Sequence, residues 1–128
     1  MFCFAVLQLH REFVRCGADV CQALTFRAGE DNLDRFTKVK QSDEPSGRDV
    51  NLAAVRLARE AAGDKYVSIS LSESNNYMEG KGKEVVMADF SKQMQFFVDA
   101  GCEIDYIVCE VCTFMFKLPT LQVISVKL

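Results

Sequence analysis

The sequence of 128 residues lacks the features that direct a chain to nucleic acid, to export or into a membrane. Lys and Arg number 15 against 18 Asp and Glu, so the basic excess typical of a nucleic-acid-binding domain is missing. No run of about 18 uncharged apolar residues occurs, because charged residues and a proline interrupt the most apolar segment, 104–128. The first residues, MFCFAVLQL, have neither the basic start nor the small-residue cleavage site of a signal peptide. We therefore expect a cytoplasmic protein that binds neither nucleic acid nor membranes.

Histidine and paired cysteine motifs are also scarce. His10 is the single histidine, and its charged neighbours favour the exposed side of a first helix over a catalytic role. Six cysteines include one CxxC pair, Cys109 and Cys112, which is weak evidence for zinc without a second pair. We expect reduced thiols in the core rather than disulfides or metal ligands. The glycines of residues 72–82 match neither a P-loop nor a GxGxxG motif.

The sequence does contain one unit three times: a helical run, a glycine, and an apolar, β-rich run. The units cover residues 9–26, 57–71 and 96–110. The glycines between the two runs are Gly17, Gly63 and Gly101. Glycine commonly follows the last helical residue, where the backbone turns left-handed. Because parallel strands need crossover helices, this repetition predicts an α/β fold with a parallel sheet.

The units predict the limits of the helices and strands. We expect helices over 1–16, 50–62 and 84–100, and strands over 18–26, 65–71 and 104–109. The first strand is rich in apolar residues and is broken by one glutamine, which is typical of a strand buried on both faces. Asp49 or Asn51 is expected to cap the second helix.

Two further segments allow more than one interpretation. Residues 27–49 form a long polar connection, which is either a solvated excursion or an active-site loop. The segment LQVISVK, residues 121–127, could pair as a further strand or belong to a tail.

Glu110 is the most informative charged residue. It follows the third predicted strand, and ligands of parallel α/β folds bind at the carboxyl ends of the strands. A carboxylate in this place could hold a cationic amine. The alternative is a solvent-facing charge that merely ends the strand.

Several segments together carry a resemblance to a known family. They are LQLHREFVRCGADVCQALTF, GEDNL, GRDVNLAAVRLAR, the strand and loop up to Tyr77 and Met78, and IDYIVCE. In this order and at this spacing they resemble the homocysteine S-methyltransferase family, and most closely its betaine-using members. The resemblance covers residues 7–112. It implies part of a (β/α)8 TIM barrel with about three βα units, and methyl transfer from betaine or a similar donor to homocysteine, giving methionine.

The resemblance also implies roles for individual residues. Glu110 matches a carboxylate that holds the amino group of homocysteine, and Thr25 and Phe26 match residues that line the pocket. Where the betaine-using members carry donor-binding tyrosines, this chain has Arg27 and Val111. The family binds zinc through three cysteines in GxNC and GGCCG motifs, and the sequence contains neither motif. The resemblance therefore assigns no metal ligand and no catalytic residue here.

The resemblance divides the chain into two parts. Residues 1–112 are expected to form a partial homocysteine-binding domain, and residues 113–128 a divergent apolar tail. Because a complete barrel needs about 250 residues, we expect a truncated family member that is inactive alone. The alternative is a noncatalytic interaction fragment that self-associates or binds a full-length family member. A small flavodoxin-like binding domain is a third interpretation, disfavoured because a phosphate-binding loop is lacking.

Overall fold

The structure is a computed structural model that describes residues 2–30, 32–33, 45–110 and 121–125. Its helices and strands alternate over most of the chain, as the repeated unit predicts. In chain order they are α1 (Phe2–Arg15), β1 (Val20–Gln22), α3 (Gly47–Ala62), β2 (Tyr66–Leu71), α4 (Asn75–Met78), α5 (Lys83–Asp99), β3 (Tyr106–Glu110) and β4 (Leu121–Ser125).

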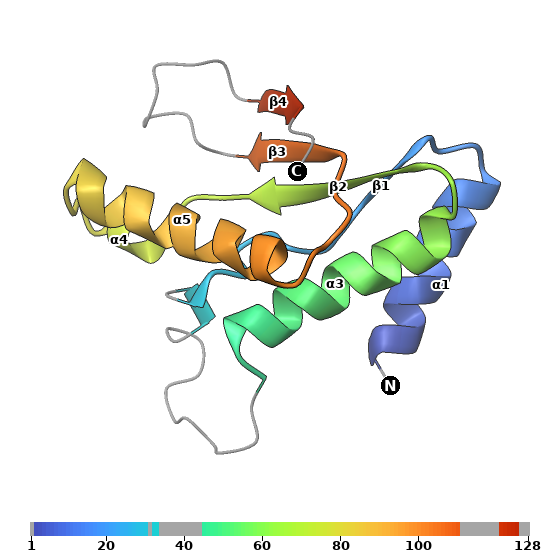
Figure 1. The fold of residues 1–128 in the computed structure, drawn as a ribbon, viewed down its shortest axis with the longest axis horizontal. Coiled ribbons are helices and arrows are strands. Elements are labelled where there is room, and N and C mark those ends of the chain that lie inside the picture. The colour runs from blue at the N-terminus through green and yellow to red at the C-terminus, as the bar shows by residue number, and fades with distance from the viewer. Residues whose placement is uncertain (1, 31, 34–44, 111–120, 126–128) are drawn as a thin grey trace.

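The strands form one sheet in the order β1-β2-β3-β4. β1, β2 and β3 are parallel, and α3 and α5 are the crossovers that join them (Figure 1). β4 is antiparallel to β3, so the segment expected either to pair or to form a tail does pair. The α/β class with parallel strands is confirmed, and the arrangement is that of consecutive βα units from a (β/α)8 barrel.

The core lies between one face of the sheet and the helices. The strands contribute alternate residues, of which Cys21, Val67 and Ile69 are each at most 4% exposed. The helices contribute an alanine-rich stripe of α3 and the ring of Phe97 from α5. Small side chains on α3 let this helix approach the sheet closely, so burial of apolar surface stabilises the layered arrangement.

The start of α3 differs from its predicted start. Ser46 is the N-cap, and its side-chain oxygen accepts a hydrogen bond from the Asp49 N–H at 3.1 Å. The Asp49 carboxylate accepts from the Ser46 N–H in return, which completes a capping box. Asp49 is thus the capping partner, not the cap. Asn51, the other predicted cap, is buried and donates to the carbonyl oxygens of Ala28 and Gly47.

The predicted burial of β1 on both faces is wrong. Cys21, Ala23 and Thr25 are at most 4% exposed, whereas Val20 and Leu24 are 43% and 53% exposed. The physical reason is the position of β1 at the end of the sheet, where the helices cover only the core face. The strand is also shorter than expected, because only Val20–Gln22 pair with β2.

The predicted exposure of His10 is also wrong. The residue is 5% exposed and lies with Leu9, Val20 and Leu24 along a cavity of about 240 Å³ between α1 and β1. Burial lowers the pKa of His10, and its Nε2 atom has no hydrogen-bond partner. The charged neighbours in sequence gave a false signal, since adjacent positions on a helix point in different directions.

In the part of the chain that the structure describes, no helix is both long enough and apolar enough to cross a membrane.

Candidate ligand site at the carboxyl ends of the parallel strands

The predicted site residues come together at one edge of the sheet. Glu110 is the last residue of β3, and Thr25 and Phe26 follow β1 within a few residues. Because β1, β2 and β3 are parallel, their carboxyl ends meet at the same edge. The residues that follow β2, Ser72 and Glu73, lie at this edge as well.

Glu110 is held by a residue from the opposite side of β2. The amide nitrogen of Gln22 donates a hydrogen bond to Glu110 Oε1. Gln22 belongs to β1 and Glu110 to β3, and β2 lies between these strands. The hydrogen bond therefore spans the central strand and fixes the carboxylate above the sheet face that is opposite to the helical core.

On the same face of the sheet as the Gln22–Glu110 hydrogen bond, β2 and the residue that follows it carry small polar side chains. Ser68, Ser70 and Ser72 alternate with the core residues of β2, and they are 1%, 0% and 5% exposed. The hydroxyl groups of Ser68 and Ser70 have no hydrogen-bond partner. The Ser72 hydroxyl accepts from the Arg27 N–H at 2.8 Å. A buried hydroxyl without a partner is unfavourable by about 1–3 kcal/mol, so two such groups at one edge call for an explanation.

Thr25 is fully buried and bonded to the backbone of β2. Its hydroxyl accepts from the Ser70 N–H at 2.7 Å and donates to the Ser70 carbonyl oxygen at 2.9 Å. The side chain thus continues the pairing of β1 with β2 beyond the last backbone pair. Phe26, the next residue, is 46% exposed at the same edge.

Arg27 and Glu73 form an ion pair beside Phe26. Arg27 has a positive φ of 51° and lies with its guanidinium carbon 5.8 Å from the centre of the Phe26 ring. Its Nη2 atom donates to Glu73 Oε1, and the Glu73 side chain is 7% exposed. Arg27 therefore occupies one face of the aromatic ring, and this face is closed to a ligand cation. Val111, the other replaced position, lies outside the described residues.

The cysteines of the described residues do not form a metal centre. No group of three or more His, Cys, Asp or Glu residues in this part of the chain could hold a metal ion. Burial raises the pKa of the Cys21, Cys102 and Cys109 thiols, which disfavours the thiolate that zinc requires. These residues lie in or against the core, as expected, whereas Cys3 and Cys16 are exposed, which the sequence did not predict. Cys112 lies outside the described residues, and the described residues do not fit the zinc site that the resemblance implies.

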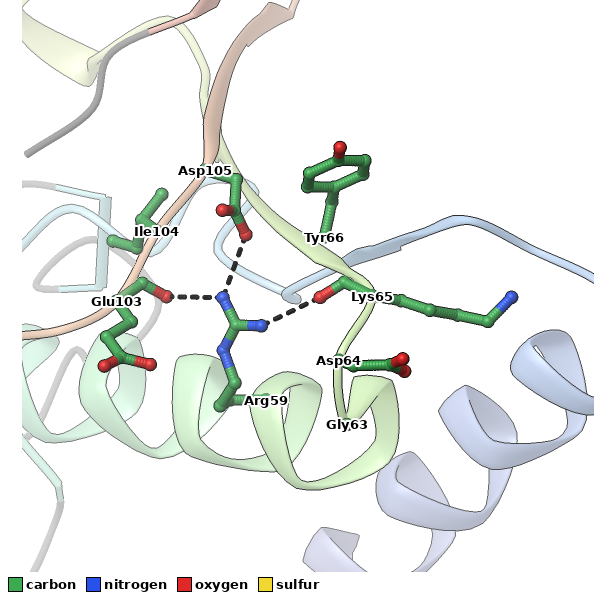
Figure 2. A pocket seen from close by; sticks show the side chains of 8 residues that line it. All are labelled: Arg59, Gly63, Asp64, Lys65, Tyr66, Glu103, Ile104 and Asp105. Carbon is green, nitrogen blue, oxygen red and sulfur yellow. Dashed lines mark hydrogen bonds and ion pairs between the residues drawn. The ribbon is translucent and has the colours of Figure 1, made fainter.

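A second cavity lies at the opposite edge of the sheet, and its polar groups are used by the protein itself. It has a volume of about 320 Å³ and is centred on Arg59 (Figure 2). The guanidinium donates to the carbonyl oxygens of Lys65 and Glu103 at 2.8 and 3.0 Å and to Asp105 Oδ2 at 2.9 Å. Arg59 thus ties α3 to the amino ends of β2 and β3. A position at the amino ends of the strands is typical of a stabilising role.

Sequence reasoning missed Gln22, Ser70 and Glu73. A signal for Gln22 existed, because its polar side chain interrupts the apolar residues on either side of it. Alternation along β2 separates Ser70 from the core residues, but it does not show that the hydroxyl lacks a partner. The pairing of Glu73 with Arg27 joins residues 46 positions apart, which spacing cannot reveal.

The fold and the site define an α/β protein of the βα-barrel type with its polar side chains at the carboxyl ends of parallel strands. A family model described as homocysteine S-methyltransferase matches residues 4–124. Betaine–homocysteine S-methyltransferase 1 of Danio rerio is 38% identical over 109 residues. The proteins of the same name from Xenopus tropicalis and Bos taurus are 38% and 37% identical over 108 residues. The chain belongs to the homocysteine S-methyltransferase family.

The aligned residues make up most of this chain but only a small part of each relative. They include 83% of this chain and 26% of each of these relatives. The chain therefore spans about a quarter of the length of the relatives it matches.

Proposed function

We propose that this chain binds homocysteine at the carboxyl ends of β1, β2 and β3, as part of the methyl-transfer chemistry of its family. The observation that carries the proposal is the Glu110 carboxylate at the end of β3, fixed above the sheet by Gln22. A carboxylate in this position attracts the ammonium group of an amino acid through a charge-assisted hydrogen bond. The family membership supplies homocysteine as the amino acid.

Thr25 and Phe26 have different parts in the proposed site. The Thr25 hydroxyl is occupied by the Ser70 backbone, so Thr25 acts by holding the end of β1 against β2. Phe26 is half-exposed and offers an aromatic surface to the carbon chain or the sulfur of the ligand.

The Phe26 ring is not free to bind a quaternary ammonium such as that of betaine. Arg27 covers the Phe26 ring with a positive charge of its own and is paired with Glu73. A quaternary ammonium would meet this charge instead of a free aromatic face. Since the described residues do not fit a zinc site, we propose that the chain by itself binds homocysteine without transferring a methyl group.

The test is to measure homocysteine binding to the 128-residue chain by isothermal titration calorimetry at pH 7.5. Glu110→Gln should weaken binding at least tenfold, because it removes the charge that pairs with the ammonium group. Glu103→Gln is the matched control, since it removes an exposed carboxylate before the amino end of the same strand. Equal binding by the Glu110 variant and the control would exclude Glu110 as the ammonium ligand. No binding by the unaltered chain would exclude the proposed function.

A second candidate function is self-association, favoured by the exposed apolar residues beside β1. Leu9, Phe13, Val20 and Leu24 line the cavity between α1 and β1 and are 43–60% exposed. The charged residues of α1 are paired within the chain, through Arg11–Glu60 and Arg15–Glu12 ion pairs. A second copy of this surface would therefore meet little like-charge repulsion.

Sedimentation equilibrium distinguishes the two candidates. A noncatalytic, self-associating chain should form dimers at micromolar concentration, and Phe13→Ser should shift the equilibrium to monomer. Met78→Ser is a control, because Met78 is equally exposed, at 60%, but lies on α4. A monomer that binds homocysteine favours the first candidate alone.

A further inference from the structure

The outer edge of β1 presents backbone groups that no described strand uses. The Ala23 N–H donates to the Ser68 carbonyl oxygen of β2 at 2.8 Å. Because the backbone groups of alternate strand residues point to opposite edges, those of Val20 and Gln22 point away from β2. In the part of the chain that the structure describes, β1 pairs with β2 alone. This edge can therefore accept a further strand, whose backbone would supply both donors and acceptors.

A cavity beside this edge suits the side chains of such a strand. It is the cavity of about 240 Å³ between α1 and β1, and its described lining residues include no Asp, Glu, Lys or Arg. His10 contributes a buried, neutral imidazole whose Nε2 atom has no hydrogen-bond partner. The occupant should therefore be uncharged, with apolar side chains and a polar group for the imidazole. Four apolar lining residues are 43–60% exposed and would be covered: Leu9, Phe13, Val20 and Leu24.

The opposite edge of the sheet offers a strand of this kind. Among the described residues β4 pairs with β3 alone, so its outer edge also has backbone groups to offer. The sequence of β4, LQVIS, contains no charged residue and three apolar ones. Its Gln122 and Ser125 are residue types that can hydrogen-bond to an imidazole. The chemistry of β4 thus matches the requirements of the cavity.

A second β1 would fit the same place less well. α1 forms one wall of the cavity, so a second β1 would bring a second α1 against the first. β4 follows β3 with no described helix between them, and it lies at the opposite edge of the sheet from α1 (Figure 1). A second copy can therefore present β4 without bringing its own α1 into the cavity.

We propose that β4 of one copy enters the cavity between α1 and β1 of a second copy and pairs with the outer edge of that β1. The proposal rests on the self-association proposed above as the second candidate function, and it names the elements that meet. The two surfaces differ, so each copy has one acceptor edge and one donor strand. Contacts of this heterologous kind close into a ring or continue as an open chain of copies. A dimer is therefore the first species formed and not the last.

Amide hydrogen exchange of the ¹⁵N-labelled 128-residue chain tests the pairing directly. At concentrations where sedimentation shows association, exchange at Val20 and Gln22 should slow about tenfold, because their N–H groups gain partners on the second copy. Exchange at Ala23 should change little, since its N–H is already bonded to Ser68. If the chain associates without slower exchange at Val20 and Gln22, this inference is wrong while self-association stands. If the chain remains monomeric, both are wrong.

Val20→Pro tests the acceptor edge. Proline removes the outward N–H and is tolerated at the first residue of a strand, so the isolated copy should keep its circular dichroism spectrum. The variant should stay monomeric at concentrations where the unaltered chain associates. Lys83→Pro is the matched control, because Lys83 is the first residue of α5, another position that tolerates proline. A Val20 variant that associates as the control does would exclude this edge from the contact.

A mixture of two blocked variants tests the head-to-tail arrangement. Val123→Pro interrupts β4 and leaves β1 unaltered, whereas Val20→Pro keeps β4. Each variant should be monomeric alone, and an equimolar mixture should form dimers that do not grow further. A mixture that stays monomeric refutes β4 as the donor strand. If Val123→Pro does not fold, excess Val20→Pro added to the unaltered chain serves instead, because it should stop growth at the dimer.

Discussion

The hydroxyl of Thr25 should contribute more to stability than its methyl group. In β2 the backbone groups of Ser68 and Ser70 point toward β1, where Ser68 accepts from the Ala23 N–H at 2.8 Å. β1 has ended at the level of Ser70, and the Thr25 hydroxyl supplies both the donor and the acceptor that are needed there. Thr25→Val keeps the shape of the side chain but leaves a buried N–H and a buried carbonyl without partners.

The magnitude follows from the two groups that are left unsatisfied. Each contributes a loss of about 1–3 kcal/mol, and the added methyl group returns about 0.8 kcal/mol. Thr25→Val should therefore lower the free energy of unfolding by about 3 kcal/mol. Thr25→Ser keeps both hydrogen bonds and loses one buried methyl group, so it should lower this free energy by only about 1 kcal/mol.

Urea denaturation followed by far-UV circular dichroism measures both variants. The chain contains no tryptophan, so its fluorescence is less informative than its circular dichroism. With a slope of about 1.5 kcal/mol per molar urea, Thr25→Val should lower the midpoint by about 2 M. A Val variant that is as stable as the Ser variant would refute the reasoning, because the hydroxyl would then contribute nothing.

Three further predictions concern other parts of the fold. Burial lowers the pKa of His10, so the unfolded chain binds its proton more readily, and the urea midpoint should fall as the pH drops from about 6.5 to 5. His10→Leu should flatten this pH dependence, and an unchanged slope in the variant contradicts the assignment. Gly47→Ala should lower the thermal midpoint despite the higher helix propensity of alanine, because an added Cβ would lie 2.7 Å from Glu30 Cγ. Arg59→Lys should lower the free energy of unfolding by about 2 kcal/mol through the loss of hydrogen bonds to Lys65 and Glu103. Arg56→Lys, an exposed replacement on the same helix, should change it by less than about 0.5 kcal/mol.

The α/β order and the parallel strands could be predicted from the sequence because each depends on local signals. Gly63 has a φ of 61° and follows α3, which is the conformation that its place between a helix and a strand predicts. Glu110 falls at the end of β3 for the same reason, since the limits of a strand and the direction of the sheet suffice to place it.

The burial of individual side chains could not be predicted in this way. His10 and Val20 were misplaced because exposure depends on which faces the helices cover and on which strand ends the sheet. Asn51 shows the same limit in the core. It is fully buried and accepts from Gln93 of α5 at 2.9 Å, a contact between residues 42 positions apart. Local patterns do not encode such a pairing, and the resemblance to the family assigned it no role.

The antiparallel strand β4 makes the two edges of the parallel sheet different for the addition of a further strand. β4 is hydrogen-bonded along the whole of β3, from Tyr106 to Glu110. A barrel needs a parallel strand in that place, so any fourth parallel strand must first displace β4. Within the described residues, no strand pairs with the other edge of the sheet, at β1. Addition of a parallel strand beside β3 would therefore require displacement of β4, whereas addition beside β1 would displace no strand of the described residues.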